Sequence, residues 1–194
     1  MSVFVKICGL TDERAVCTAI DAGADAVGFV FHEQSPRNLS LTDAVRLGNL
    51  IPDVVKKVAV TMHPDESLWQ RIQEALEPDV LQTDFDDFEY LRVQAEVEKW
   101  PVLREGSVPQ ELPDVFVYEG RQSGQGETVD WEIAASLSRR GRMILAGGLS
   151  TENIAEAVAK VSPFGVDVSS AVESAPGVKD PGMIRAFIDA AKAA

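Results

Sequence analysis

The sequence contains few cysteines and no long apolar run. Its two cysteines, Cys8 and Cys17, cannot build a disulfide framework and lack the spacing of a metal site. No apolar stretch approaches the roughly 18 residues that a membrane-spanning helix needs, and the opening MSVFVKICGL lacks the layout of a signal peptide. We therefore expect two reduced thiols in a cytoplasmic protein with no membrane partner.

Basic residues are also scarce. Eighteen Lys and Arg stand against 31 Asp and Glu, so the formal net charge is −13. Nucleic-acid phosphates require a positive footprint on their partner, and we expect no nucleic-acid partner here. A small anionic ligand is still compatible with this charge, because a buried site can carry local positive charge on an acidic protein.

Short apolar segments alternate with helical patterns along the chain. The apolar segments are rich in Val, Ile and Phe, as buried parallel strands are; they are residues 3–8, 26–31, 57–62, 79–83, 101–105, 115–119, 143–148 and 164–170. Helices are predicted at residues 11–24, 41–51, 65–76, 87–100, 130–141, 150–161 and 180–194. Between the fifth and sixth apolar segments, Pro109 and Pro113 leave room for a turn at most.

This alternation predicts one α/β domain over residues 1–194, folded as a (β/α)8 TIM barrel. The chain is short for that fold, so the barrel must be compact, with its fifth helix reduced or missing. A doubly wound open sheet is the alternative, although no GxGxxG dinucleotide motif follows a predicted strand. Barrels place their active sites at the C-terminal ends of the strands, so the residues that end the strands are the candidates for chemistry.

Turns of small residues follow the last two predicted strands. The segment LAGGLSTEN places Gly147 and Gly148 before a helix expected to start at Ser150, and GVDVSSAVES places Ser169 and Ser170 after the eighth strand. Backbone N–H groups in such turns bind anions, assisted by a helix N-terminus, and barrels commonly bind phosphate at these two loops. We expect a phosphate site there; the alternative is that the glycines only permit tight turns.

The first and sixth predicted strands carry ionisable residues. Lys6 and Cys8 are two residues apart and therefore face the same side of the strand; Cys8 ends the strand, and Lys6 would favour its thiolate. A buried Lys6 needs a partner, for which Asp167 on the adjacent eighth strand is our hypothesis. Glu119 ends the sixth strand and would hold a proton near neutral pH if desolvated. Alternatively, Cys8 is a small buried hydrophobe and Glu119 a solvated loop acid.

Three further polar residues lie near strand ends. Arg37 follows Pro36 in the loop after the second strand, and its guanidinium suits a carboxylate or a phosphate. His32 and His63 have no partner pattern that implies a metal. We interpret both histidines as solvated or rim residues and expect no metal site.

Together these motifs resemble the phosphoribosylanthranilate isomerase family. The matching segments are VKICGLT (5–11), GADAVGFVF (23–31) with SPR (35–37), GETVDW (126–131) in part, LAGGLSTENI (145–154) and VDVSSAVESAPGVKD (166–180). The resemblance implies an enzyme of tryptophan biosynthesis that converts N-(5′-phosphoribosyl)anthranilate into 1-(2-carboxyphenylamino)-1-deoxyribulose 5-phosphate by an Amadori rearrangement. It implies no metal or cofactor, and it leaves monomer and homodimer open.

The resemblance also implies roles for individual residues. Cys8 corresponds to the family's general base, and Arg37 to the arginine that binds the anthranilate carboxylate. The residues of the phosphate-binding turns correspond to Gly147, Gly148, Ser169 and Ser170, and the polar residue beside the sugar to Asp167. With Lys6 and Gln82, these residues form the expected substrate-binding set.

The sequence departs from the family pattern on one side of the site. The family usually has an aspartate as general acid after the sixth strand, where this chain offers Glu119, with Asp130 as another candidate. In the loop SGQGET (123–128), Glu127 takes the place of the family's lysine. The segment QTDF (82–85) retains Gln82 of the family's QLHG but lacks its histidine.

These departures leave two alternative functions open. A non-catalytic barrel that binds a phosphorylated ligand would need the phosphate turns but not the acid. The third hypothesis is another phosphosugar enzyme, including one that uses Lys6 as a Schiff-base nucleophile, which requires a depressed pKa and open access to the lysine. The expected position of Lys6, one layer below the barrel mouth, disfavours that third hypothesis.

Overall fold

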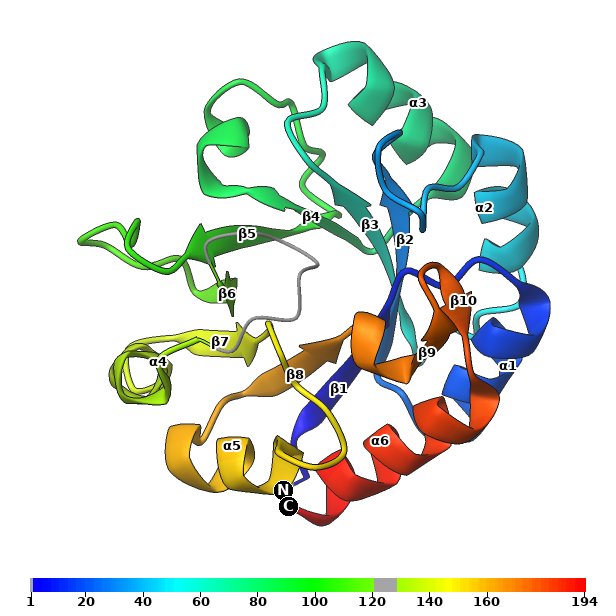
Figure 1. Ribbon diagram of the computed structural model, residues 1–194. Helices are drawn as coiled ribbons and strands as arrows, with labels where there is room; N and C mark the ends of the chain where they lie inside the picture. Colours follow the sequence, from blue (N-terminus) through cyan, green and yellow to red (C-terminus); the bar gives the residue numbers. More distant parts are fainter. Residues whose placement is uncertain (1, 121–128) are drawn as a thin grey trace.

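Eight parallel strands close into a barrel in the computed structural model, which describes residues 2–120 and 129–194 (Figure 1). Neighbouring strands pair in sequence order, and β8 pairs with β1 to close the ring. The barrel strands are β1 (Phe4–Cys8), β2 (Ala26–Phe31), β3 (Lys56–Thr61), β4 (Val80–Asp84), β5 (Glu98–Arg104), β6 (Val115–Glu119), β7 (Arg142–Leu145) and β8 (Gly165–Val168). The predicted (β/α)8 barrel is confirmed, and the open-sheet alternative is wrong.

The helices lie around the outside of this ring of strands (Figure 1). In the described part of the chain they are α1 (Glu13–Asp21), α2 (Leu41–Gly48), α3 (Glu66–Leu76), α4 (Trp131–Ser138), α5 (Ile154–Val161) and α6 (Pro181–Ala193). Two short 3₁₀-helices, η1 (Phe85–Glu89) and η2 (Ser170–Val172), follow β4 and β8, and a small hairpin of β9 (Glu173–Ala175) and β10 (Val178–Lys179) precedes α6.

The helix predicted at residues 87–100 is wrong. Only η1 forms there, and β5 already begins at Glu98, which pairs in register with Val80 of β4. Trp100 is buried inside the barrel, so strand pairing and apolar burial outweigh the helical pattern of this segment. The described residues 105–114, between β5 and β6, form no helix, as their two prolines predicted.

Aromatic and aliphatic side chains pack inside the barrel near the N-terminal ends of the strands. Phe4 contacts Trp100 edge-on and stacks on Phe164, with ring centroids 5.8 and 5.4 Å apart. They belong to an interior apolar cluster that includes Val58, Val80, Val117 and Ile144. The buried polar side chains Lys6, Gln82 and Asp167 lie farther toward the C-terminal ends of the strands, whereas Lys56 and Glu98 form a solvent-exposed ion pair at the N-terminal ends.

Acidic residues begin most of the helices. The side chains of Asp12, Asp65, Asp130 and Asp180 each accept a backbone N–H bond in the first turn of α1, α3, α4 and α6. A carboxylate at this position satisfies an unpaired helix N–H and complements the helix dipole, so part of the acidic excess is structural. In the described segments, no helix is both long and apolar enough to cross a bilayer.

Candidate active site

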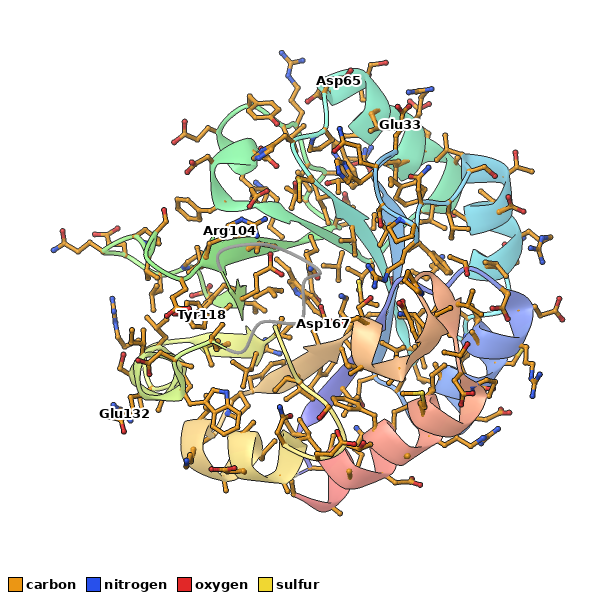
Figure 2. All side chains as sticks on the ribbon, in the orientation of Figure 1. Glu33, Asp65, Arg104, Tyr118, Glu132 and Asp167 are labelled. Carbon is orange, nitrogen blue, oxygen red and sulfur yellow. The ribbon has the colours of Figure 1, made fainter. Side chains whose placement is uncertain are left out.

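A cavity of about 860 Å³ opens at the C-terminal ends of the barrel strands. Figure 2 shows Asp167 near the middle of the barrel, whereas Glu33, Asp65 and Glu132 lie at its periphery. All the predicted site residues except Lys6 line the cavity: Cys8, Arg37, Gln82, Glu119, Gly147, Gly148, Asp167, Ser169 and Ser170.

Lys6 lies below the cavity and is paired with Asp167. Its Nζ donates to Asp167 Oδ2 at 2.7 Å, and its side chain is fully buried. Burial opposes the charge of this lysine, but the Asp167 carboxylate and the Cys8 sulfur outweigh it and raise the Lys6 pKa above its ordinary value. The predicted ion pair is confirmed. A protonated, enclosed lysine is poorly suited to Schiff-base chemistry.

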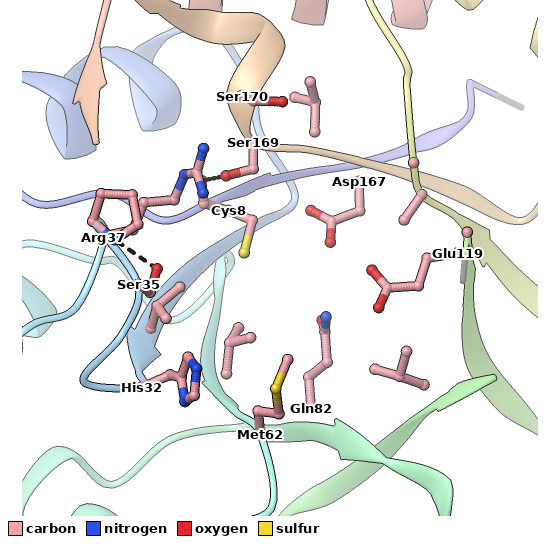
Figure 3. A pocket seen from close by; sticks show the side chains of 18 of the residues that line it. Cys8, His32, Ser35, Arg37, Met62, Gln82, Glu119, Asp167, Ser169 and Ser170 are labelled. Carbon is pink, nitrogen blue, oxygen red and sulfur yellow. Dashed lines mark hydrogen bonds between the residues drawn. The ribbon is translucent and has the colours of Figure 1, made fainter. Parts of the chain in front are cut away.

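Cys8 ends β1 with its sulfur directed into the cavity (Figure 3). Gly28 on β2 leaves the space that this sulfur occupies, since a Cβ there would lie 3.1 Å from Cys8 Sγ and 3.2 Å from Lys6 Cε. Burial raises the pKa of the Cys8 thiol above its ordinary value, and the ammonium groups of Lys6 and Lys179 act in the opposite direction. The thiol therefore lies among charged groups at an accessible cavity.

Glu119 faces the same cavity from the opposite wall (Figure 3). Its side chain is only 14% exposed, so the interpretation as a solvated loop acid is wrong. Arg104, at the end of β5, lies between two carboxylates: its Nη1 is 2.5 Å from Glu119 Oε1, and its Nη2 is 2.7 Å from Asp84 Oδ1. The cavity wall opposite Cys8 thus contains a network of two ion pairs that joins Asp84, Arg104 and Glu119.

Sequence reasoning gave Asp84 no role, and it considered Arg104 as a strand-end candidate but left it out of the expected substrate-binding set. Alternation along β5 was an available signal, because Arg104 follows Trp100 and Val102 on the inward-facing side. Asp84 is the residue that stands where the family has histidine. Asp130, the other candidate acid, caps α4 and is exposed outside the cavity, whereas Glu127 lies outside the described residues.

His63 has partners that the sequence did not indicate. Its ring is 67% exposed, as expected for a rim residue, but Nδ1 lies 2.8 Å from Asp87 Oδ1 and Nε2 lies 3.5 Å from Asp84 Oδ2. One ligand atom of each of these three residues lies within 4.8 Å of the others, close enough to hold a cation. The guanidinium of Arg104 already neutralises Asp84, and its charge opposes a metal ion there.

The hydrogen bond to Asp87 raises the pKa of His63 above its ordinary value of about 6.5. In a pH titration by NMR, we expect the His63 ring, assigned with His63→Gln, to titrate above this value and Asp87→Asn to lower its pKa. Since the folded pKa is raised, the bond stabilises the fold fully below the unfolded pKa and is lost as pH rises through the folded one. A His63 pKa at or below the ordinary value contradicts this assignment.

The two small-residue turns lie side by side because β7 pairs with β8. Gly147 and Gly148 have φ values of +86° and +62°, a left-handed backbone that favours glycine. The α5 helix begins at Ile154 rather than at the predicted Ser150, because the Asn153 side chain ties the preceding turn by accepting from Ser150 N and donating to Gly148 O. These turns line one end of the cavity and present a backbone suited to an anion.

Arg37 lines the cavity in a fixed orientation. Its Nε and Nη2 donate to the two carboxylate oxygens of Glu173 at 2.7 and 2.9 Å. Its backbone N–H donates to Ser35 Oγ at 3.1 Å (Figure 3). Glu173 was absent from the sequence-based site; its position before a Pro–Gly turn, on a short hairpin, was the available signal.

The cavity also carries polar atoms that lack partners. The buried oxygens Thr61 Oγ1, Gln82 Oε1 and Asp167 Oδ1 belong to cavity-lining residues and have no hydrogen-bond partner in the part of the chain that the structure describes. Buried polar groups are almost always paired. These acceptors therefore suit the hydroxyl groups of a bound ligand.

Comparison with known proteins gives a consistent result. The family model described as N-(5′-phosphoribosyl)anthranilate (PRA) isomerase matches residues 5–190. The N-(5′-phosphoribosyl)anthranilate isomerase of Chelativorans sp. strain BNC1 is 40% identical over 100% of this chain and 98% of its own length. The protein of that name from Parvibaculum lavamentivorans is 35% identical, with 100% of both chains covered.

Solved structures resemble the barrel over its whole length. The phosphoribosyl anthranilate isomerase of Thermotoga maritima is 30% identical with a TM-score of 0.87, covering 99% of this chain and 100% of that one. TrpF from Jonesia denitrificans is 32% identical with a TM-score of 0.83, covering 98% and 97%. A third structure, 29% identical with a TM-score of 0.82 and covering 99% and 100%, is a phosphoribosyl anthranilate isomerase in complex with reduced 1-(o-carboxyphenylamino)-1-deoxyribulose 5-phosphate.

Proposed function

The chain belongs to the phosphoribosylanthranilate isomerase family, the isomerases of tryptophan biosynthesis, and from this premise we propose the residues that perform its reaction. Cys8 is the general base and Glu119 the general acid in the conversion of N-(5′-phosphoribosyl)anthranilate into 1-(2-carboxyphenylamino)-1-deoxyribulose 5-phosphate. The observation that carries this proposal is that Cys8 and Glu119 face one cavity from opposite walls (Figure 3).

Substrate binding follows from the distribution of groups around the cavity. The phosphate lies at the turns of Gly147–Gly148 and Ser169–Ser170, next to the end of β8. Arg37, held by Glu173, binds the anthranilate carboxylate. The ribose between these two anions donates hydroxyl hydrogen bonds to Gln82 Oε1 and Asp167 Oδ1, two buried oxygens that have no other partner among the described residues.

Ring opening is the first chemical step. Glu119 in its protonated form gives its proton to the furanose ring oxygen, and the bond from C1′ to that oxygen breaks with its electron pair going to oxygen. The nitrogen lone pair forms the C1′=N bond of a protonated Schiff base. Arg104 fixes the Glu119 side chain at the cavity wall and stabilises the carboxylate that remains after the transfer.

Proton abstraction is the second step. The Cys8 thiolate removes the proton from C2′, and the electrons of that C–H bond form the C1′=C2′ bond of an enolamine while the C1′=N electrons return to nitrogen. The enolamine then tautomerises, with C2′ becoming the ketone and C1′ gaining a hydrogen. C2′ is oxidised and C1′ is reduced within one molecule, so the reaction needs no external electron acceptor.

A turnover assay tests the proposed function. Purified protein is expected to convert N-(5′-phosphoribosyl)anthranilate, followed as loss of the substrate's fluorescence, and to restore growth of a tryptophan auxotroph that lacks the isomerase. The Cys8→Ala protein serves as the control for uncatalysed reaction. Binding of the reduced product analogue combined with wild-type turnover no faster than this control would identify a non-catalytic binding barrel instead.

Glu119→Gln is expected to lower kcat by about 10²–10⁴-fold, because the amide keeps the shape of the side chain but has no acidic proton to give. A general acid also produces a fall in kcat/KM on the alkaline side of the pH profile, and this limb is expected to disappear in the Gln variant. Steady-state kinetics across a pH series provide the measurement.

Glu119→Asp is the matched control. It keeps a carboxylic acid and restores the residue usual in the family, but the group moves back by one methylene. A displacement of about 1 Å can lower the rate about 100-fold, so kcat of Glu119→Asp should fall by no more than this factor. Equal activity of wild type and the Gln variant would exclude Glu119 as the acid.

A further inference from the structure

Lys179 is a buried lysine that the proposed mechanism does not use. Its side chain has no exposed surface. Its Nζ donates to Glu173 Oε1 at 2.7 Å, to the Ser169 carbonyl oxygen at 2.8 Å and to Ser169 Oγ at 3.2 Å. An ammonium group has three protons to donate, so all of them have acceptors.

The β9–β10 hairpin brings this lysine to the site. Glu173 and Lys179 are register partners on the two strands, joined through the turn at Pro176–Gly177. The hairpin connects η2 to α6 and lies beside the cavity mouth, which Ser174 and Ala175 also line. The carboxylate of Glu173 and the ammonium of Lys179 therefore have fixed positions relative to the ends of β1 and β8.

The contacts of this pair reach three proposed functional groups. Glu173 orients Arg37 through two hydrogen bonds. Ser169, which accepts from Lys179, donates its own hydroxyl to the Cys8 carbonyl oxygen at 3.1 Å. One ammonium and one carboxylate thus connect the carboxylate anchor, a phosphate turn and the strand end that carries the base.

We propose that Lys179 is a positioning residue for the isomerisation, which fixes Ser169 against the Cys8 end of β1 and supplies positive charge beside the base. This inference rests on the proposed role of Cys8. Lys179 itself does not line the cavity, so it acts through Ser169, which does, and through its charge.

Charged groups reach Cys8 from each neighbouring element. Lys6 lies on its own strand, Asp167 on β8 and Lys179 on β10, and the Arg37 stem packs against Gly9. The two ammonium groups favour the thiolate and Asp167 opposes it. Removal of Lys179 leaves Lys6 as the remaining ammonium beside the sulfur, so the thiol is expected to ionise at higher pH.

The test measures the thiol directly, without substrate. All proteins carry Cys17→Ser, which removes the other free cysteine. The rate of Cys8 alkylation by iodoacetamide is measured against pH with no further change, with Lys179→Met and with Lys192→Met. Lys192→Met is the control, because it breaks a different ion pair, Lys192–Asp25 of α6. We expect only Lys179→Met to shift the alkylation profile to higher pH. A shift of one pH unit lowers the thiolate population, and with it kcat, about tenfold below the pKa. The rising part of the kcat profile at low pH should shift to higher pH by the same amount.

Glu173→Gln gives an independent result of the same sign. Burial lowers the pKa of Lys179, and the Glu173 carboxylate opposes that effect. Without the carboxylate the ammonium loses its proton at lower pH, so Cys8 has less positive charge beside it and the alkylation profile is expected to move to higher pH. This variant decides the question if Lys179→Met does not fold. Unchanged alkylation and kcat profiles in a folded Lys179→Met, or in Glu173→Gln, overturn the inference. The alkylation profile does not depend on turnover, whereas failure of the proposed function is recognised separately, by full activity of Cys8→Ala.

Discussion

Replacing Cys8 with alanine is expected to lower kcat of the isomerisation by about 10²–10⁴-fold, the contribution that a positioned general base makes. The side chain lies at the end of β1, where alanine removes only the sulfur from a cavity wall, so the fold should persist. Steady-state kinetics with N-(5′-phosphoribosyl)anthranilate, together with circular dichroism, provide the measurement.

The pH dependence of this effect follows from the raised pKa of the thiol. Only the thiolate accepts a proton, so wild-type kcat/KM should increase with pH until Cys8 is ionised. The residual activity of Cys8→Ala should lack this rising limb. Cys8→Ser is the matched control: it nearly keeps the size of the side chain and replaces the thiol with a hydroxyl that does not ionise at neutral pH, so this variant should be almost as inactive as Cys8→Ala. An alanine variant within about threefold of wild type, well short of the loss expected for a base, would rule out Cys8.

Replacing Lys6 with methionine is expected to destabilise the fold by about 3–5 kcal/mol, because it leaves Asp167 charged and buried without its partner. Methionine matches the length of the lysine stem, so lost packing contributes little. Urea unfolding at neutral pH, compared with wild type, provides the measurement.

The stability deficit of Lys6→Met should depend on pH. Without the ammonium, burial raises the folded pKa of Asp167 above its unfolded value. Folding then takes up a proton, so the deficit is small below the unfolded pKa of about 3.9 and grows as pH rises through the folded pKa. The double variant Lys6→Met/Asp167→Leu removes both charges and should recover most of the stability but no activity. A single variant as stable as wild type at neutral pH contradicts the buried ion pair.

The barrel itself was predictable because its signal is repeated. Each apolar segment between helices carries the same information, so an error in one does not change the fold. The segment 87–100 shows the limit: its spacing is helical, but Trp100 gains more by entering the barrel than by lying on a surface helix. The local sequence pattern does not report how much apolar surface a side chain buries in the folded barrel.

The site was predictable where strand alternation and turn chemistry act within a few residues. Alternation gave Lys6, Cys8 and their inward direction, and barrel closure then gave Asp167 as the partner. Contacts between side chains of distant loops left no such signal. Arg37 reaches Glu173 across 136 residues of sequence, and this pairing depends on the folded geometry of loops that the sequence pattern describes only as polar. Arg104 joins Asp84 to Glu119 at the ends of three neighbouring strands, where the register of the strands brings the side chains together.

The closing contact between β1 and β8 has a consequence for synthesis of the chain. Cys8 emerges from the ribosome early, but Asp167 and Ser169 follow about 160 residues later, with sequence separations of 161 for the Lys6–Asp167 and Ser169–Cys8 bonds, and Lys179 later still. Domains generally fold as units during translation. A nascent chain that lacks β8 therefore carries the proposed base without Asp167, without Ser169 and without a closed ring around it, so activity is expected only after the last strand has been made.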